Sequence, residues 1–193
     1  RRQPWRMSAA TRGWALVRRG GVEGGIALIG QGMAERGAGT EITRPYSLAL
    51  LAEACVTGGR FEEARQPIGE ALERVRRTGE RWYESELHRL AGELTLATGR
   101  SAPQAQTARR GRSTHRDGGT RAEAQTCFEQ ALAIAHRQQA RALELRAALS
   151  LVRLPGPTAP RQKARRRLAE IYGWFTEGFE LPDLVEARRV LQA

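Results

Sequence analysis

The sequence predicts an all-α fold, an array of about four helical hairpins closed by a C-terminal capping helix. The first observation behind this prediction is a set of small, large and small residues that recurs at helical spacing. Small residues let a second helix come close, and the larger middle residue fills the space between neighbouring hairpins. Two copies are clear and two are weaker: Ala64, Ile68 and Ala71; Ala124, Phe128 and Ala131; Gly25, Ile29 and Gly32; Ala164, Leu168 and Ile171.

The second observation is the distance between the copies. Gly25 and Ala64 are 39 residues apart and Ala124 and Ala164 are 40 apart, whereas 60 residues separate Ala64 from Ala124. We interpret this as a period of about 40 residues that carries an insertion of about 20. Residues 100–120 lack apolar periodicity and are rich in Ser, Thr, Gly and Arg, so they are expected to form a basic, flexible insertion.

The first hairpin is expected to pair a helix over 8–19 with a helix over 22–36, joined at Gly20 and Gly21. Its second helix contains four glycines, each of which costs roughly 1 kcal/mol relative to alanine. Two of the four stand at the close-packing positions of the repeat. We therefore expect this hairpin to be the least stable.

The second hairpin is expected to pair a helix over 45–57 with a helix over 60–77. Pro45 suits the first turn of its helix. Pro67 lies inside the second helix, where it removes a hydrogen bond, yet the apolar period continues beyond it. The prediction here is a helix with a kink.

The third hairpin is expected to pair 80–98 with 121–138 across the insertion, and the fourth to pair 140–154 with 161–172. A Pro-rich turn separates the two helices of the fourth hairpin, because proline does not continue a helix. A last helix is expected over 183–191.

Large apolar side chains in this half of the chain are assigned to the core. Phe128 is expected to be buried, with Leu132 and Leu145 as its apolar neighbours. The last apolar face of a repeat array needs a cover. We assign this cover to an aromatic cluster and the last helix, that is, to Trp174, Phe175, Phe179, Leu184 and Leu191.

One continuous repeat domain is expected. Its segments are hairpins 1 and 2 with the first helix of hairpin 3 (1–99), the insertion (100–120), the rest of hairpin 3 with hairpin 4 (121–172), and the aromatic cap with the terminal helix (173–193). No run approaches the roughly 18 apolar residues of a membrane span, and a signal peptide is not evident. A cytoplasmic location is expected, and the start at Arg1 suggests the C-terminal piece of a longer protein.

The chain is strongly basic, with a formal net charge of +11 and Lys163 as its only lysine. Residues 100–121 carry six Arg against Asp117, and residues 161–167 carry five basic residues and no acid. Such clusters could meet the phosphates of a nucleic acid. An Arg- and Ala-rich composition with a solvated loop produces the same charge without a ligand, so both interpretations stay open.

Catalytic and metal chemistry find little support in the sequence. A P-loop needs Gly-Lys-Ser/Thr, and Lys163 follows Gln162. Cys55 and Cys127 lack CxxC spacing and fall on apolar helical faces, and the three histidines have no partner at ligand spacing. No enzyme activity, cofactor or metal is expected for this chain.

The repeat residues Gly59, Phe61, Ala64, Ile68 and Ala71, with the copy at Ala124, Phe128 and Ala131, resemble the tetratricopeptide repeat. A more specific set lies at 44–54, 79–94, 131–140, 144–148 and 172–179. Together these segments resemble the C-terminal repeat region of large bacterial signalling proteins described as predicted ATPases or adenylate/guanylate cyclases. The resemblance implies a superhelical array that acts as a sensor or docking surface. A cyclase of that family would hold metal ions with two aspartates, and the only aspartates here are Asp117 and Asp183.

The function expected is that of a non-catalytic interaction or sensor scaffold that binds a protein or peptide, or an upstream domain of the same polypeptide. In this architecture the opening helices line a concave surface, whose candidate binding residues are Tyr46, Glu53, Glu86, Arg89, Glu93, Arg146 and Arg153. Their mixed charges favour a peptide over a polyanion. The alternative is a nucleic-acid-binding helical array, part of a transcriptional regulator, that uses the Arg clusters.

Overall fold

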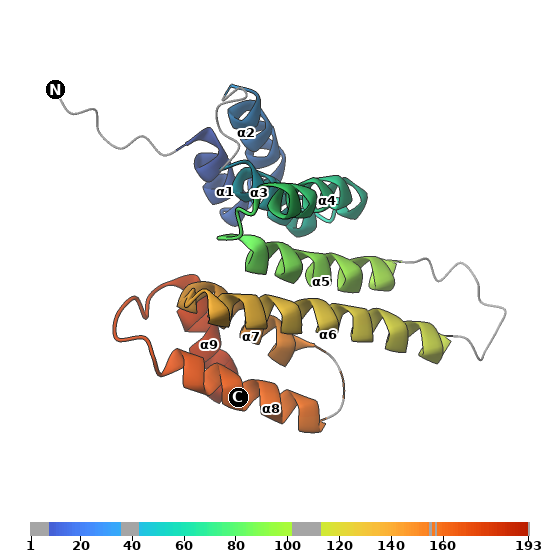
Figure 1. Ribbon diagram of the computed structural model, residues 1–193, viewed down its shortest axis with the longest axis vertical. Coiled ribbons are helices and arrows are strands. Elements are labelled where there is room, and N and C mark those ends of the chain that lie inside the picture. Colours follow the sequence, from blue (N-terminus) through green and yellow to red (C-terminus); the bar gives the residue numbers. More distant parts are fainter. Residues whose placement is uncertain (1–7, 36–42, 102–112, 155, 157, 193) are drawn as a thin grey trace. The chain divides into compact units, whose positions relative to one another are not determined.

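The computed structural model describes residues 8–35, 43–101, 113–154, 156 and 158–192 (Figure 1). This part of the chain forms nine α-helices and contains no strand, so the predicted all-α class is confirmed. The chain divides into two compact units, with the boundary between Tyr83 and Glu84. The sequence had predicted one continuous domain. We call them unit 1 and unit 2 and describe each by itself.

Unit 1 consists of two helical hairpins. Helix α1 (Ala9–Arg18) packs against α2 (Val22–Ala34), and α3 (Arg44–Thr57) packs against α4 (Phe61–Thr78). Helix α3 also contacts both helices of the first hairpin, so the two hairpins stack. Pro67 is buried within α4, which continues past it as predicted.

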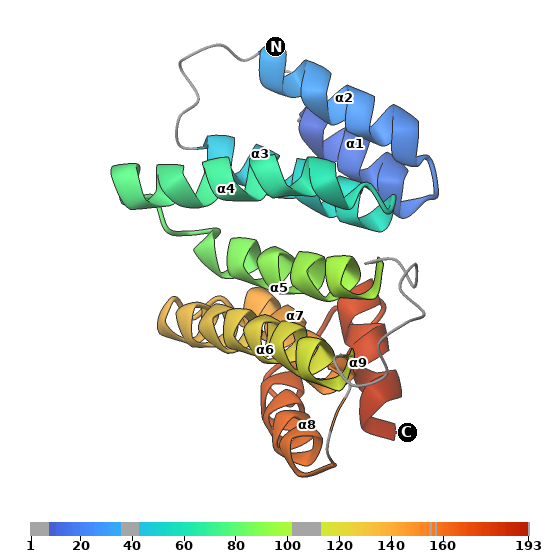
Figure 2. The same ribbon diagram turned by 90° about the vertical axis from the view of Figure 1, so that its right-hand side faces the viewer.

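Unit 2 contains two further hairpins and a single last helix (Figure 2). Helix α5 (Glu84–Ser101) packs against α6 (Ser113–Arg137), and α7 (Arg141–Arg153) packs against α8 (Thr158–Tyr172). Helix α7 also contacts α5 and α9 (Pro182–Gln192). Each opening helix of unit 2 thus touches the next one, and α9 takes the place of a further opening helix.

The predicted insertion is helical at both ends. Helix α5 extends to Ser101 and α6 begins at Ser113, so the expectation of irregular structure is wrong for residues 113–120, while residues 102–112 lie outside the described part. The two helices stay close there: a Cβ added to Gly99 would lie 3.2 Å from the Cβ of Thr120. Small residues continue the pairing where the apolar period stops.

Three turns share one hydrogen-bonding pattern, in which an amide donates to the carbonyl five residues earlier. The bonds are Gly21 N to Leu16 O (3.0 Å), Arg60 N to Cys55 O (2.8 Å) and Ala140 N to Ala135 O (3.0 Å). The residue before each donor is left-handed, with φ of 93° at Gly20, 72° at Gly59 and 55° at Gln139. The α6–α7 turn uses a glutamine where glycine is favoured, at a cost of roughly 1 kcal/mol.

The repeat register predicted from the sequence is confirmed, since its twelve positions are all buried except Ala164, which is half-buried. In the first hairpin, the glycines at this register allow close contact between α1 and α2. A Cβ on Gly32 would lie 2.7 Å from the Cβ of Ala9, and one on Gly25 would overlap Val17. Gly13 makes the matching approach from α1, because a Cβ added to it would lie 2.6 Å from the Gly25 carbonyl oxygen.

Phe128 is fully buried, as predicted, but its neighbours differ from the predicted ones. The ring lies over Gly92 of α5, where an added Cβ would be 2.5 Å from the ring edge. It packs with Leu96, Leu151 and Leu154, whereas Leu132 and Leu145 belong to a separate core with α8 and α9. A glycine on the facing helix provides the space for the phenyl ring.

The predicted C-terminal cover is only partly confirmed. Leu184 is buried, and Phe175 and Leu191 pack against the same core. Trp174 is 59% exposed and stacks on the guanidinium of Arg141 at 5.5 Å, so it does not cover the core. Phe179 contacts the ring of Tyr172 at 5.8 Å.

Candidate functional site

The predicted concave-surface residues of unit 1 make contacts inside that unit. The ring of Tyr46 lies 5.5 Å from that of Trp82 and 5.0 Å from that of Tyr83. Glu53 is 8% exposed and accepts a 2.7 Å hydrogen bond from the indole nitrogen of Trp14. Both side chains therefore join elements of unit 1 that are distant in the sequence.

In unit 2 the predicted residues on α5 form a buried ion-pair cluster. Glu86 is 1% exposed and pairs with Arg89 at 2.7 Å and with Arg146 of α7 at 3.1 Å. Glu93 pairs with Arg89 at 3.3 Å and accepts a 2.8 Å hydrogen bond from the Ser150 hydroxyl. The charges of Glu86, Arg89 and Glu93 are thus satisfied by neighbours on α5 and α7.

The cluster continues from α7 to α9. Arg146 reaches Asp183 at 3.7 Å, and Arg153 pairs with Glu186 at 3.0 Å, which also pairs with Arg189 at 2.9 Å. Hydrogen bonds from Arg189 and then from Arg153 lower the pKa of Glu186 to about 2. We call the whole set the ion-pair ladder: Glu86, Arg89, Glu93, Arg146, Arg153, Asp183, Glu186 and Arg189.

The ladder contains four carboxylates and four guanidinium groups, so its formal charge is zero. Four of the five predicted residues of unit 2, Glu86, Arg89, Glu93 and Arg146, are linked by ion pairs among themselves, whereas Arg153 pairs with Glu186 of α9. Breaking a buried pair by removing one partner typically costs about 3–5 kcal/mol, because a charge is left uncompensated. The ladder joins α5, α7 and α9, and its charges balance over the whole set, although two arginines share Glu186 at the α9 end.

A groove between α6 and α8, with α7 at its base, is a stronger candidate for ligand binding. Its volume is about 820 Å³. Apolar residues of the three helices line part of it, namely Leu132, Ala148, Leu151, Leu154 and Ala164, and basic residues line the rest, namely Arg121, Arg161, Lys163, Arg166 and Arg167. Gln125, Glu129 and Pro160 complete the lining. We call this cavity the α6–α8 groove.

Helical periodicity explains why these residues share one groove. Arg121, Gln125, Glu129 and Leu132 follow one another at spacings of four, four and three residues, which places them on one face of α6. On α8 the same rule groups Pro160, Lys163 and Arg166. Since α6 and α8 both pack against α7, the two faces border one cavity.

Most cations of the groove lack an acidic partner. Arg161, Lys163 and Arg166 are exposed, and no ion pair within the described part of unit 2 neutralises them. Arg121 is half-buried, and its Nε is buried with no hydrogen-bond partner among the residues that the structure describes. The only carboxylate in the lining is Glu129, which accepts a 2.8 Å hydrogen bond from Gln125. The groove thus carries a clear excess of positive charge.

Arg167 differs from the other four cations because it is held in place. It pairs with the fully buried Glu144 at 3.0 Å and with Glu170 at 3.1 Å. Glu144 also pairs with Arg141 at 2.7 Å and contacts His136 Nδ1 at 3.0 Å. These interactions connect α8, through Arg167, to α7 and to the end of α6, and so hold together the three helices that line the groove.

In the described ranges no group of three or more His, Cys, Asp and Glu side chains is arranged to hold a metal ion. Cys55 and Cys127 are free thiols, and burial raises the pKa of each. No helix in the described part of the chain combines the length and the hydropathy that crossing a bilayer requires.

Comparisons with known proteins give no relative from which a function could be inferred. No family model matches the chain, and no curated protein or solved structure matches it significantly. The function must therefore be argued from the geometry of the two units.

Proposed function

We propose that this chain is a non-catalytic protein-interaction module of the cytoplasm, and that its α6–α8 groove binds an acidic, leucine-rich segment of a partner protein. The observation that carries this proposal is the combination of an apolar base with Arg121, Arg161, Lys163 and Arg166, which lack acidic partners within the described residues. Helical grooves of this kind accept an amphipathic helix through apolar anchors at i, i+3 and i+4.

Charge complementarity supports an acidic segment. Uncompensated guanidinium and ammonium groups attract carboxylates and raise the association rate. The apolar residues Leu132, Leu151 and Leu154 give the partner's leucine side chains a surface to bury. Both properties are needed together, because neither charge nor apolar area alone specifies a partner.

A peptide fits this lining better than a nucleic acid does. Single-stranded nucleic acids are usually bound by a basic surface with aromatic side chains on which bases stack. The described lining of the groove includes no aromatic residue, and leucines occupy the places where a platform would be needed. Nucleic-acid binding is therefore the alternative that the experiment below must exclude.

At the level of the whole protein, we propose that the hairpins follow tetratricopeptide-like superhelical stacking and form the C-terminal repeat module of a larger bacterial signalling ATPase or cyclase. The contacts of α7 with both α5 and α9 support such stacking within unit 2. Reading the gene upstream of Arg1 tests the second part. A nucleotide-binding domain is expected there, and an unrelated domain would contradict it.

The proposed groove function is tested with synthetic probes. Fluorescence anisotropy would measure binding of the labelled peptide EELLEELLEELL, with a Kd in the micromolar range expected at 150 mM salt. KKLLKKLLKKLL and a peptide of twelve glutamates should bind at least tenfold more weakly, because each lacks one of the two required properties. A 12-base-pair DNA duplex that bound more tightly than EELLEELLEELL, with a steep loss between 50 and 200 mM salt, would favour the nucleic-acid alternative.

Charge-reversal variants locate the site. Lys163→Glu combined with Arg166→Glu should weaken EELLEELLEELL binding at least tenfold. The matched control is Arg137→Glu with Arg188→Glu, which removes the same charge from exposed positions outside the groove. Equal losses in both double variants would mean that only net charge matters, and the proposal would fail.

A further inference from the structure

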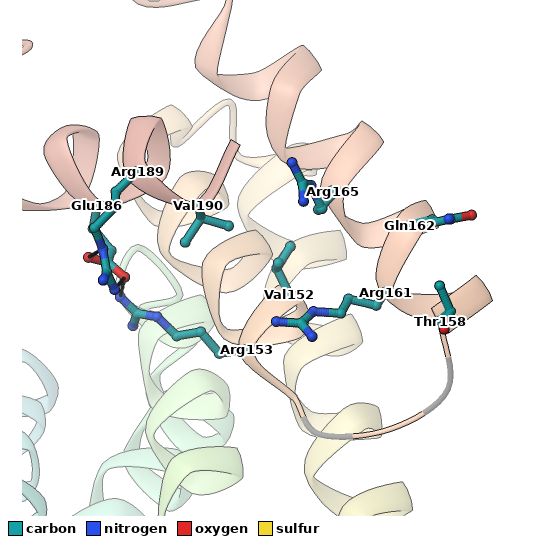
Figure 3. A pocket seen from close by; sticks show the side chains of 9 residues that line it. All are labelled: Val152, Arg153, Thr158, Arg161, Gln162, Arg165, Glu186, Arg189 and Val190. Carbon is teal, nitrogen blue, oxygen red and sulfur yellow. Dashed lines mark hydrogen bonds and ion pairs between the residues drawn. The ribbon is translucent and has the colours of Figure 1, made fainter. Parts of the chain in front are cut away.

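A second cavity in unit 2 gathers arginines from three helices (Figure 3). It has a volume of about 680 Å³ and lies between the end of α7, the first half of α8 and α9. Arg153, Arg161, Arg165 and Arg189 line it, and the side chain of Arg161 extends toward Val152 (Figure 3). Only Arg161 is shared with the α6–α8 groove.

The charges around this cavity do not balance. Glu186 is the only acidic residue in the lining, and it is already shared by Arg153 and Arg189, as the dashed lines in Figure 3 show. Arg165 donates a 2.9 Å hydrogen bond to the carbonyl oxygen of Leu191, which is a neutral acceptor. Arg161 forms no ion pair within the described part of the chain. Four guanidinium groups against one carboxylate leave a formal excess of three positive charges.

Apolar residues in the cavity wall strengthen the attraction between the excess positive charge and an anion. Val152 is buried and Val190 is half-buried, so part of the cavity wall is apolar, while Arg153, Arg161 and Arg189 are themselves exposed. Charges interact more strongly next to material of low dielectric constant. Like charges held at such a place repel one another, and an anion that binds between them relieves the repulsion.

We infer that this cavity is a binding site for a small phosphorylated molecule, held by Arg161 and Arg165 with help from Arg153 and Arg189. The planar guanidinium group donates two parallel hydrogen bonds that match the oxygens of a phosphate group. A single carboxylate would compensate only one of the three excess charges, whereas a compound with two phosphates compensates most of them. The volume lies within the range of about 300–1,000 Å³ that is usual for small-molecule sites.

The position of Thr158 places a second source of positive potential, the amino-terminal end of a helix, beside the cavity. It is the first residue of α8 and lines the cavity, so the amino-terminal end of that helix adjoins the site. The free amides and the dipole of a helix amino terminus favour a phosphate. The four arginines supply most of the positive charge of the cavity, and the helix end adds a smaller contribution.

Isothermal titration calorimetry with sodium pyrophosphate at 150 mM salt and pH 7.5 tests the inference on the intact chain. One saturable site is expected. Arg161→Gln and Arg165→Gln should each raise the Kd about tenfold or more, because each removes charge-assisted hydrogen bonds. The matched control is Arg188→Gln on α9, an exposed residue outside the cavity, which should leave the Kd within twofold of wild type.

Glu186→Gln provides a gain of affinity that a merely destabilised protein would not give. Removing this carboxylate frees Arg153 and Arg189 for the ligand and eliminates one repulsive charge, so the pyrophosphate Kd should fall severalfold. The absence of saturable binding, a Kd unchanged in both Arg161→Gln and Arg165→Gln, or an equal loss in Arg188→Gln would each overturn the inference. Lys163→Gln, which lines only the groove, should affect the peptide probe and not pyrophosphate, so the two proposals fail independently.

Discussion

The ion-pair ladder and the α6–α8 groove lie in the same unit and share α7, yet they use charge in opposite ways. In the ladder each carboxylate has an arginine within 3.7 Å, and Glu86 is 1% exposed. In the groove, Arg161, Lys163 and Arg166 are exposed and have no acidic partner within the described part of unit 2. Both regions contain many charged residues, so composition alone does not distinguish them.

The comparison teaches that pairing, and not the number of charged residues, separates a structural surface from a candidate binding surface. A buried charge with enough partners to balance it, such as Glu86, contributes to stability and offers little to a ligand. An unpaired charge at a groove contributes little to stability and remains available.

The largest effect on the free energy of unfolding is expected from the core around Phe128, to which the groove residues Leu151 and Leu154 also belong. Phe128→Ala removes a fully buried ring from its place over Gly92 and should cost about 3–5 kcal/mol. This is a large share of the roughly 5–15 kcal/mol that stabilises a domain. Hydrogen exchange should show protection falling across residues 121–191 more than across 45–77, because stacked hairpins are coupled to their nearest neighbours. Protection that stays at the wild-type level would contradict the packing described here.

The next largest change in the free energy of unfolding is expected in the ladder, and a matched variant in the groove provides the comparison. Glu86→Gln leaves Arg89 and Arg146 without their common carboxylate and should cost about 3 kcal/mol. The matched change in the groove is Glu129→Gln at an exposed position, which should stay within about 0.5 kcal/mol. Urea denaturation measures both variants. An equal loss of stability in the two variants would contradict the claim that the ladder stabilises the fold more than the charges of the groove do.

A smaller effect concerns pH. The arginines lower the pKa of Glu186 from 4.5 to about 2, so the carboxylate is favoured in the folded state. Its stabilisation is fully present above pH 4.5 and is lost as the pH falls toward 2. After allowance for solvent screening we expect about 1 kcal/mol. The difference between wild type and Glu186→Gln should therefore shrink from pH 6 to pH 2, and a constant difference would contradict the assignment.

The smallest effect on stability is expected in the groove itself. Lys163→Gln and Arg166→Gln remove exposed cations without an acidic partner in the described residues, so each should change the free energy of unfolding by less than about 0.5 kcal/mol. Thermal melting would measure this. A substantial loss of stability would show that these side chains serve the fold, as the ladder does.

The sequence predicted the helices and the repeat register well, because both depend on local periodicity. Phe128 was correctly expected in the core between Ala124 and Ala131. The residues that contact Phe128 were not predicted correctly. Gly92 has a low helix propensity, and the sequence does not show that a glycine is needed there to make room for the Phe128 ring. Residues 113–120 were expected to be irregular because they lack apolar periodicity, yet they are helical, and at Thr120 the close approach to α5 is made against Gly99.

The candidate site was less accessible to sequence reasoning. The basic run 161–167 was noticed, but helix α8 divides it: Lys163 and Arg166 face the groove, while Arg165 faces the other cavity. Arg121 joins the groove from a helix some 40 residues earlier, which no local pattern reveals. Of the predicted concave-surface residues of unit 2, Glu86, Arg89, Glu93 and Arg146 form ion pairs among themselves and Arg153 pairs with Glu186, which only the distances between side chains reveal.

The most direct test of the central claim is methyl NMR of the intact chain during titration with EELLEELLEELL. If the unpaired cations and apolar base of the groove form the binding site, the methyl signals of Leu132, Leu151 and Leu154 should shift with one saturation curve. The buried Leu87 and Leu90, on the helix that carries the ladder, should remain unchanged. Shifts confined to Leu87 and Leu90, with the groove leucines unaffected, would contradict the account.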